Sequence, residues 1–193
     1  MPAPSRRPDN QQPIAPLRWP VTFGVGLMAL VMTALWWLGN YDASGLMMDA
    51  RAVSSEPWRL LTSTLLHGGP LHLIFNLYWL WVFGRFVEEW WGQTVTFGLF
   101  VLFGAVSGAA EYAIFTGGIG LSGIGYGLFA MLWVAGRRDR RLQGVVDDQT
   151  AVLFVGWFFF CIAATIGDVM SIANVAHGVG ALIGACAGFV VTS

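Results

Sequence analysis

The chain has 193 residues, of which 56% are apolar and only 11% are charged, and its formal net charge is −1 at pH 7. Soluble globular domains carry about 25% charged residues, so this composition excludes an ordinary soluble domain. The sequence contains neither a phosphate-binding loop nor the paired Cys/His spacing of a zinc site, so no metal or cofactor is expected.

In chain order, residues 1–17 come first and contain five prolines. This segment is predicted to be a disordered cytoplasmic tail. The apolar run that follows Arg18 is longer than the core of a typical signal peptide, and five further apolar segments come after it. We therefore expect this run to be a retained first helix.

Six uncharged runs follow one another along the rest of the chain, and each approaches the ~20 residues that cross a ~30 Å hydrocarbon core. The short second run is expected to extend through Arg85 towards Glu89, with the arginine head group reaching the interface. We therefore predict an all-α membrane protein, with six transmembrane helices in one compact domain over residues 18–193. The runs lie at about 20–39, 71–84, 93–110, 120–136, 149–167 and 169–191.

The distribution of arginine predicts the orientation in the membrane. If the N-terminus is cytoplasmic, eight of the ten basic residues fall on the cytoplasmic side, and only Arg51 and Arg59 fall outside. This positive-inside bias places the C-terminus inside as well, because the number of spans is even. The outer loop at 40–70 mixes acidic residues with apolar ones, which favours a structured loop lying partly in the membrane interface.

Four polar side chains lie in segments that otherwise hold apolar residues: Ser122, His177, His72 and Asn76. Polar groups are costly in hydrocarbon, so such residues usually face a protein interior or a water-filled cavity. At 1.5 Å per residue, Ser122 lies roughly 22 Å from Arg137 and His177 roughly 24 Å from the C-terminus, so the two share one depth. His72 and Asn76 bracket the same plane on the second helix.

A serine and a histidine at matched depth indicate a nucleophile and its base, and a second histidine with an asparagine indicates oxyanion donors. Simpler roles exist for each residue by itself. A serine at a helix start is commonly an N-cap, and Asn76 could bond another helix. The full set favours a serine protease that cuts inside the membrane.

Glycines accompany both members of the Ser–His pair. Gly123 and Gly127 lie beside Ser122, and a stripe continues the face of His177 at Gly180, Gly184 and Gly188. Small residues let helix backbones approach closely enough for a side-chain hydrogen bond across the interface. Ordinary helix packing explains the glycines equally well when they are considered alone.

Five motifs occur in order along the chain between about residues 20 and 191. They are Trp58-Arg59, His67-Gly-Gly-Pro-Leu-His72-Leu-Ile-Phe-Asn76, Gly84-Arg-Phe-Val-Glu88, Gly120-Leu-Ser-Gly-Ile-Gly-Tyr126 and Met170-Ser-Ile-Ala-Asn-Val-Ala-His177-Gly-Val-Gly. With these motifs the chain resembles the rhomboid family of intramembrane serine proteases. A lone Gly-x-Ser-Gly is a weak signal, but the whole set, each motif on the expected helix, is a strong one.

The resemblance implies a six-helix core and a Ser–His dyad without the acidic third member of a triad. Ser122 would be the nucleophile and His177 its general base, while His72, Asn76 and the Ser122 backbone N–H would stabilise the oxyanion. As support for the dyad, Tyr126 would pack against the His177 ring and Gly123 would allow the close helix approach. Tyr126 as a plain core residue is the alternative.

The resemblance also implies the partners and the location. Substrates would be transmembrane helices of single-span membrane proteins, cut from a wet cavity that opens to the outer face of a bacterial inner membrane. The lipid bilayer is the other expected partner, and no nucleic acid is expected. The sequence leaves the cleavage-site sequence and the oligomeric state open.

An aromatic gate for substrate entry is predicted between the second and fifth helices. Phe75 lies beside Asn76, and the resemblance puts Phe159, within the run Phe158-Phe159-Phe160, opposite it. Aromatic side chains that simply face lipid are the alternative.

Two other function classes compete with the protease. One is a non-proteolytic relative that binds membrane helices, although such proteins typically lose the serine or the histidine, and this chain retains both. The other is a small channel or transporter, which the absence of an internal repeat and the single depth of the polar groups disfavour. Of the remaining polar residues, Glu88 is expected to tie helix ends together, His67 to fasten a loop and Glu111 to line a water pocket.

Overall fold

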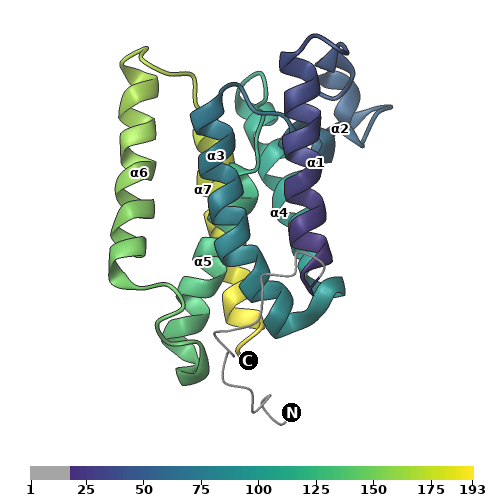
Figure 1. Ribbon diagram of the computed structural model, residues 1–193. Helices are drawn as coiled ribbons and strands as arrows, with labels where there is room; N and C mark the ends of the chain where they lie inside the picture. The colour runs from purple at the N-terminus through teal and green to yellow at the C-terminus, as the bar shows by residue number, and fades with distance from the viewer. Residues whose placement is uncertain (1–17) are drawn as a thin grey trace.

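The computed structural model describes residues 18–193, which form a bundle of helices joined by loops (Figure 1). The predicted tail at 1–17 lies outside the described residues. Residues 18–193 contain no strand, in agreement with the all-α prediction. The α-helices are α1 (Pro20–Trp37), α2 (Arg59–Thr62), α3 (Pro70–Trp79), α4 (Arg85–Ile114), α5 (Ser122–Arg138), α6 (Asp148–Ile166) and α7 (Asn174–Val190).

Three helical stretches are long and apolar enough to cross a bilayer: Pro20–Trp37, Asp148–Ile166 and the continuous run Pro70–Ile114. The last helix, α7, is a shorter apolar helix of 17 residues. These stretches fit the predicted membrane protein. The number of six spans stays a prediction.

The run Pro70–Ile114 is not one straight rod. Between α3 and α4 the residues Leu80–Gly84 form a π-helical turn. Within α4, Gly92 interrupts the helix with a φ of +82°, a conformation that glycine adopts without strain. A Cβ atom placed on Gly84 would lie 3.2 Å from the ring of Phe100, so the chain after Gly92 folds back along the chain before it. The break falls close to Glu89, where the second predicted helix was expected to end.

The last helix begins at Asn174, whereas the sequence predicted a run starting at 169. After α6 the chain turns at Asp168, whose φ of +54° lies in the left-handed region. The backbone N–H groups of Val169 and Met170 then donate to the Ala164 carbonyl at 2.9 and 3.3 Å. The predicted break between the runs at Asp168 agrees with this turn, but mainly apolar residues resume at Val169, so hydropathy alone did not show that the helix begins only at Asn174.

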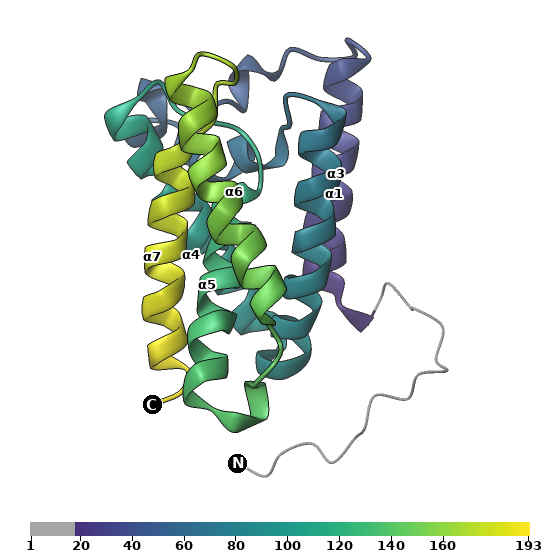
Figure 2. The same cartoon turned by 90° about the vertical axis from the view of Figure 1, so that its left-hand side faces the viewer.

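At the centre of the bundle lies α5, most of whose residues between Gly123 and Ala135 are buried. The neighbouring helix α7 packs against it backbone to backbone (Figure 2). A Cβ atom on Gly180 would lie 2.3 Å from the Gly123 carbonyl oxygen, and one on Gly184 would lie 2.1 Å from that of Gly127. No side chain fits at these points, so the glycine stripe sets the distance between the two helices.

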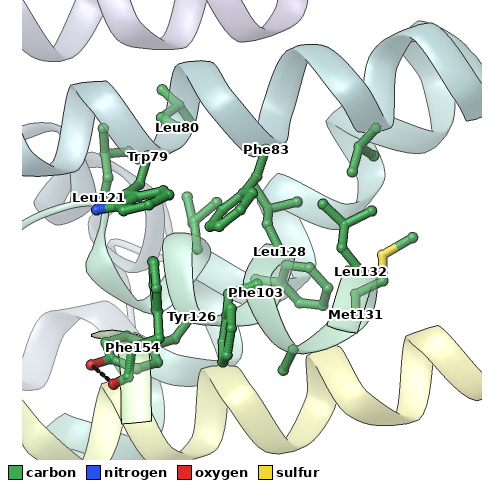
Figure 3. Packing of buried hydrophobic residues seen from close by; sticks show 14 of the residues in the cluster. Trp79, Leu80, Phe83, Phe103, Leu121, Tyr126, Leu128, Met131, Leu132 and Phe154 are labelled. Carbon is green, nitrogen blue, oxygen red and sulfur yellow. Dashed lines mark hydrogen bonds between the residues drawn. The ribbon is translucent and has the colours of Figure 1, made fainter. Parts of the chain in front are cut away.

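Aromatic side chains fill the space between α3, α5 and α6 (Figure 3). Phe154 of α6 stacks on Phe129 of α5 with ring centroids 4.4 Å apart, and it lies edge-on to Trp79 of α3 at 4.9 Å. Phe83 stacks on Trp79 at 5.0 Å, and its ring centroid lies 5.5 Å from that of Phe154. Each such pair adds about 0.5–1.5 kcal/mol beyond the area that it buries. Phe154 therefore joins α6 to both neighbouring helices.

The loop between α1 and α3 is a chain of short helical turns, as the prediction of a structured loop requires. They are η2 (Ala43–Gly45), η3 (Ala50–Val53), α2 and η4 (Ser63–Leu65). Arg59 is only 2% exposed, and its Nη1 donates to the carbonyl oxygens of Ser44 and Met47 at 2.6 and 2.8 Å, while its Nε pairs with Glu56. Charge-assisted hydrogen bonds from one buried guanidinium thus hold the loop together.

Candidate active site

Ser122 and His177 meet at the starts of two helices. Ser122 is the first residue of α5, and His177 lies in the first turn of α7. The Ser122 Oγ and the His177 Nε2 are 2.8 Å apart, which is hydrogen-bond distance. His177 is buried, whereas Ser122 is only partly buried. The site therefore pairs a hydroxyl that is partly accessible with an imidazole that is buried.

The imidazole of His177 is held by an aromatic ring. Tyr126, one turn along α5 from Ser122, stacks on it with ring centroids 4.7 Å apart and an interplanar angle of 23°. The Tyr126 hydroxyl donates to the carbonyl oxygen of Phe154 at 3.1 Å, which fixes the ring from α6 (Figure 3). Among residues 18–193 the His177 Nδ1 has no hydrogen-bond partner. Packing, and not a carboxylate, therefore orients this histidine.

Two further predicted site residues lie on the neighbouring helix α3. The His72 ring touches the loop that precedes Ser122, since a Cβ atom on Gly120 would lie 2.7 Å from the His72 Nε2. Gly120 also has a φ of +109°, so both the contact and the backbone require glycine there. The Asn76 side chain is buried, and its Nδ2 donates to the His72 carbonyl oxygen at 2.9 Å. His72 and Asn76 are therefore adjacent, but the amide is engaged within its own helix.

The fully buried His67 fastens the same loop from the other side. Its Nε2 accepts from the Leu121 backbone N–H at 3.4 Å, and its ring centroid lies 4.9 Å from that of His72. The Trp37 indole N–H donates to the His67 carbonyl oxygen at 3.0 Å. These contacts fit the loop-fastening role expected for this residue.

A small cavity opens beside Ser122, with a volume of about 20 Å³. Ser107 and Glu111 of α4 line it together with backbone of the loop at Gly118–Gly120. A polar cavity holds a water molecule once its volume exceeds about 10–15 Å³, so this one has room for one. The prediction that Glu111 lines a water pocket agrees with this position. Within residues 18–193, no three His, Cys, Asp or Glu side chains are grouped to hold a metal ion.

Two buried glutamates bond to the starts of other helices. Glu88 accepts from the backbone N–H groups of Val21 and Thr22 at 2.9 and 2.8 Å, which ties the end of the second span to α1 as expected. Glu111 accepts from the Ala176 N–H at 2.9 Å. Sequence reasoning missed this second contact, and only the presence of an acid in an apolar run pointed to it.

The aromatic pair predicted as a gate is arranged differently from the expectation. The Phe75 ring lies 5.5 Å from that of Trp157, and Phe159 is 62% exposed on α6. The neighbouring Phe158 faces inward, 6.0 Å from Tyr126. The residue that meets Phe75 across from α3 is therefore Trp157. A gate at this place stays a prediction.

Comparison with known proteins gives one family. A family model described as the rhomboid domain matches residues 54–193, well over half of the chain. The rhomboid protease GlpG of Haemophilus influenzae is 30% identical over 137 residues, which cover 70% of each chain. The proteins of the same name from Photorhabdus laumondii and an Enterobacter species are 32% and 33% identical over 185 and 147 residues.

Coverage differs among these relatives. The match takes in 91% of this chain but 62% of the Photorhabdus protein, and 72% of this chain but 50% of the Enterobacter protein. The aligned part thus spans about half to two thirds of their length. The range matched by the family model, 54–193, contains the helices that carry Ser122 and His177. On the extent of the family match and the identity to these relatives, the chain belongs to the rhomboid family of intramembrane serine proteases.

Proposed function

We propose that the protein is an intramembrane serine endopeptidase that cuts transmembrane segments of single-span membrane proteins with a Ser122–His177 dyad. The observation that carries this proposal is the 2.8 Å distance between the Ser122 Oγ and the His177 Nε2. A hydroxyl is a weak nucleophile until a base at hydrogen-bond distance accepts its proton.

The reaction takes place in two halves. The Ser122 Oγ attacks the scissile carbonyl carbon while its proton passes to the His177 Nε2, and the carbonyl oxygen becomes an oxyanion. When the tetrahedral intermediate collapses, His177 gives the proton to the leaving amine, and the C–N bond breaks. Water then attacks the acyl-enzyme, His177 accepts its proton, and Ser122 regains a proton as the acid product leaves.

Three donors are proposed for the oxyanion: the Ser122 backbone N–H, His72 and Asn76. The N–H groups of the first helical turn have no partner inside the helix, so that of Ser122 is available at the start of α5. His72 lies against the loop that leads into Ser122. The Asn76 Nδ2 has to leave the His72 carbonyl oxygen or use its second hydrogen in order to take part.

Tyr126 and Gly123 are proposed to support the dyad. The stacked tyrosine ring limits rotation of the imidazole, which is part of what an aspartate does in a triad. Gly123 lets α4 approach, because a Cβ atom there would lie 2.2 Å from the Ser107 Oγ, whereas the Ala176 carbonyl oxygen of α7 would be an ordinary contact at 3.6 Å. On the α7 side it is the Gly123 carbonyl group that lies against Gly180.

We further propose that the dyad is reached from the outer face of a bacterial inner membrane, with both termini cytoplasmic. Ser122 begins α5, while the arginine cluster from Arg137 to Arg141 follows its other end. The Arg138 Nε donates to the Thr192 Oγ1 at 3.1 Å, so the C-terminus lies on the arginine side. Arginine is enriched in cytoplasmic loops, which supports this orientation.

The decisive experiment labels and assays the purified protein. A fluorophosphonate probe should modify wild-type protein and Ser193→Ala, which removes a serine at the far end, but not Ser122→Ala. Ser122→Ala and His177→Ala should each abolish cleavage of a single-span reporter, and the double variant should be little worse than either single one. Substantial cleavage by either single variant contradicts the dyad. Binding of the reporter without cleavage by the wild type would favour the non-proteolytic relative.

A further inference from the structure

The helix that carries His177 lacks a cap of its own. The N-cap residue of α7 is Ala173, whose side chain has no hydrogen-bond acceptor. The first N–H groups of any helix have no partner inside it and need one from elsewhere. In α7 one of these groups belongs to Ala176, the residue immediately before His177.

Glu111 of α4 supplies the missing acceptor. Its Oε2 accepts from the Ala176 N–H at 2.9 Å, and the side chain is only 4% exposed. A glutamate in the last turn of a helix faces the negative end of its own helix dipole, which is unfavourable. The positive end of α7 offsets this cost. A buried carboxylate also needs a hydrogen-bond partner, and this N–H is one.

The contact acts on the turn that orients the dyad. The His177 N–H donates to the Ala173 carbonyl oxygen at 3.2 Å, so His177 belongs to the same turn that Glu111 holds. The loop on the other side is equally tight, since a Cβ atom on Gly118 would lie 2.6 Å from the Ala173 Cβ and 3.6 Å from the Glu111 Cγ. Glu111 therefore fixes the start of α7 against α4 and the loop before Ser122.

We infer that Glu111 is a positioning residue for His177, and that it works as an N-cap for α7 supplied by another helix. This inference rests on the proposed function, in which the Ser122–His177 distance controls the rate. What matters in this role is a hydrogen-bond acceptor that reaches Ala176, and not the negative charge. The cavity beside Ser122 suggests a different role, in which the carboxylate activates a water molecule, and the test separates the two.

Three substitutions separate reach from charge. Glu111→Gln keeps the length and an acceptor oxygen but removes the charge. Glu111→Asp keeps the charge, but its side chain is one methylene shorter, so the carboxylate no longer reaches the Ala176 N–H. Glu111→Leu removes the acceptor altogether. A displacement of about 1 Å in a catalytic group costs on the order of 10²-fold in rate. Glu111→Gln should thus retain kcat within about threefold, whereas Glu111→Asp and Glu111→Leu should lose about tenfold to 100-fold, with KM changed less than about threefold.

Hydrogen exchange at the start of α7 provides a readout that does not depend on proteolysis. The peptide containing Ala176 should exchange at the wild-type rate in Glu111→Gln and faster in Glu111→Asp and Glu111→Leu. Tyr112→Phe, a change at the neighbouring residue of α4, is the control and should alter neither measurement. If the leucine variant does not fold, the glutamine and aspartate variants decide the question. If the wild type cuts nothing, the proposed function fails, while the exchange order still tests the cap.

Two results would overturn the inference. In the first, Glu111→Asp is as active as Glu111→Gln, which would show that reach does not matter, or it is more active, which would make the charge the important property. In the second, Glu111→Gln accumulates the acyl-enzyme with unchanged exchange at Ala176, which would assign the carboxylate to water activation.

Discussion

Gly180→Ala tests whether the backbone contact between α5 and α7 sets the geometry of the dyad. The added Cβ would lie 2.3 Å from the Gly123 carbonyl oxygen and 3.1 Å from its carbonyl carbon. An ordinary contact begins at 3.4 Å, so the two helices must separate by about 1 Å. Gly123 follows Ser122 directly, and Gly180 lies one turn after His177. The displacement therefore falls on the dyad itself.

The expected loss follows from the dyad distance. An increase of about 1 Å takes the 2.8 Å Ser122–His177 contact beyond hydrogen-bond range. We expect kcat to fall on the order of 10²-fold. Overpacking of this kind should also lower the unfolding free energy by about 1–3 kcal/mol. Cleavage of a single-span reporter and thermal unfolding in the same detergent measure the two effects.

Gly178→Ala is the matched control on the same helix. A Cβ atom there would meet only the Phe158 ring at 3.6 Å, an ordinary contact, so activity should stay within about threefold of wild type. Full activity of Gly180→Ala, or equal losses in both variants, would refute the idea that the glycine stripe controls the dyad distance.

Three further predictions concern other parts of the molecule. His72→Ala and Asn76→Ala should each lower kcat by up to about 10²–10³-fold with little change in KM, and the loss should be smaller if the three donors are partly redundant. Steady-state kinetics measure both constants. An unchanged kcat in both variants would assign these residues to packing. Phe75→Ala should speed cleavage of a transmembrane reporter more than that of a short soluble peptide, because only the former needs lateral entry, and equal effects on both substrates would rule out a gate. Arg59→Met should lower the unfolding free energy by about 3–5 kcal/mol because it leaves Glu56 and two carbonyl groups without their buried partner. The exposed Arg51→Met should cost at most about 1 kcal/mol, and equal shifts in thermal unfolding would show that burial of Arg59 adds nothing.

The sequence was most informative where polar residues interrupt apolar runs. Ser122 and His177 are recognisable as site residues because each stands in an apolar segment, and depth arithmetic predicts that they lie on one level. The glycines of α5 and α7 likewise predicted that the two helices approach each other closely. For Ser122 and His177 the signal was a polar side chain in an apolar segment, and for the glycines it was the absence of a side chain at helical spacing.

Where the apolar character is uniform, that signal is lost. The residues around Phe159 on α6 are apolar on every face, so the rotation of the helix was undetermined, and the ring that meets Phe75 turned out to be Trp157. The start of α7 was predicted too early for a related reason, because mainly apolar residues follow Asp168 directly. The Glu111–Ala176 contact could not be predicted from the sequence, because it depends on how α4 and α7 cross, and no local pattern encodes that.

The bonds from Glu88 to α1 have a consequence for the order of assembly. α1 is synthesised first, and its Val21 and Thr22 N–H groups find their acceptor in a residue 67 and 66 positions further along the chain. At 5–20 residues per second the ribosome needs about 3–13 s to make that stretch. Until then hydration has to satisfy these groups, which keeps the start of α1 at the membrane surface. Once Glu88 has been synthesised, its carboxylate replaces water as the acceptor for the Val21 and Thr22 N–H groups. The helix that carries Glu88 therefore packs against an α1 that has already formed.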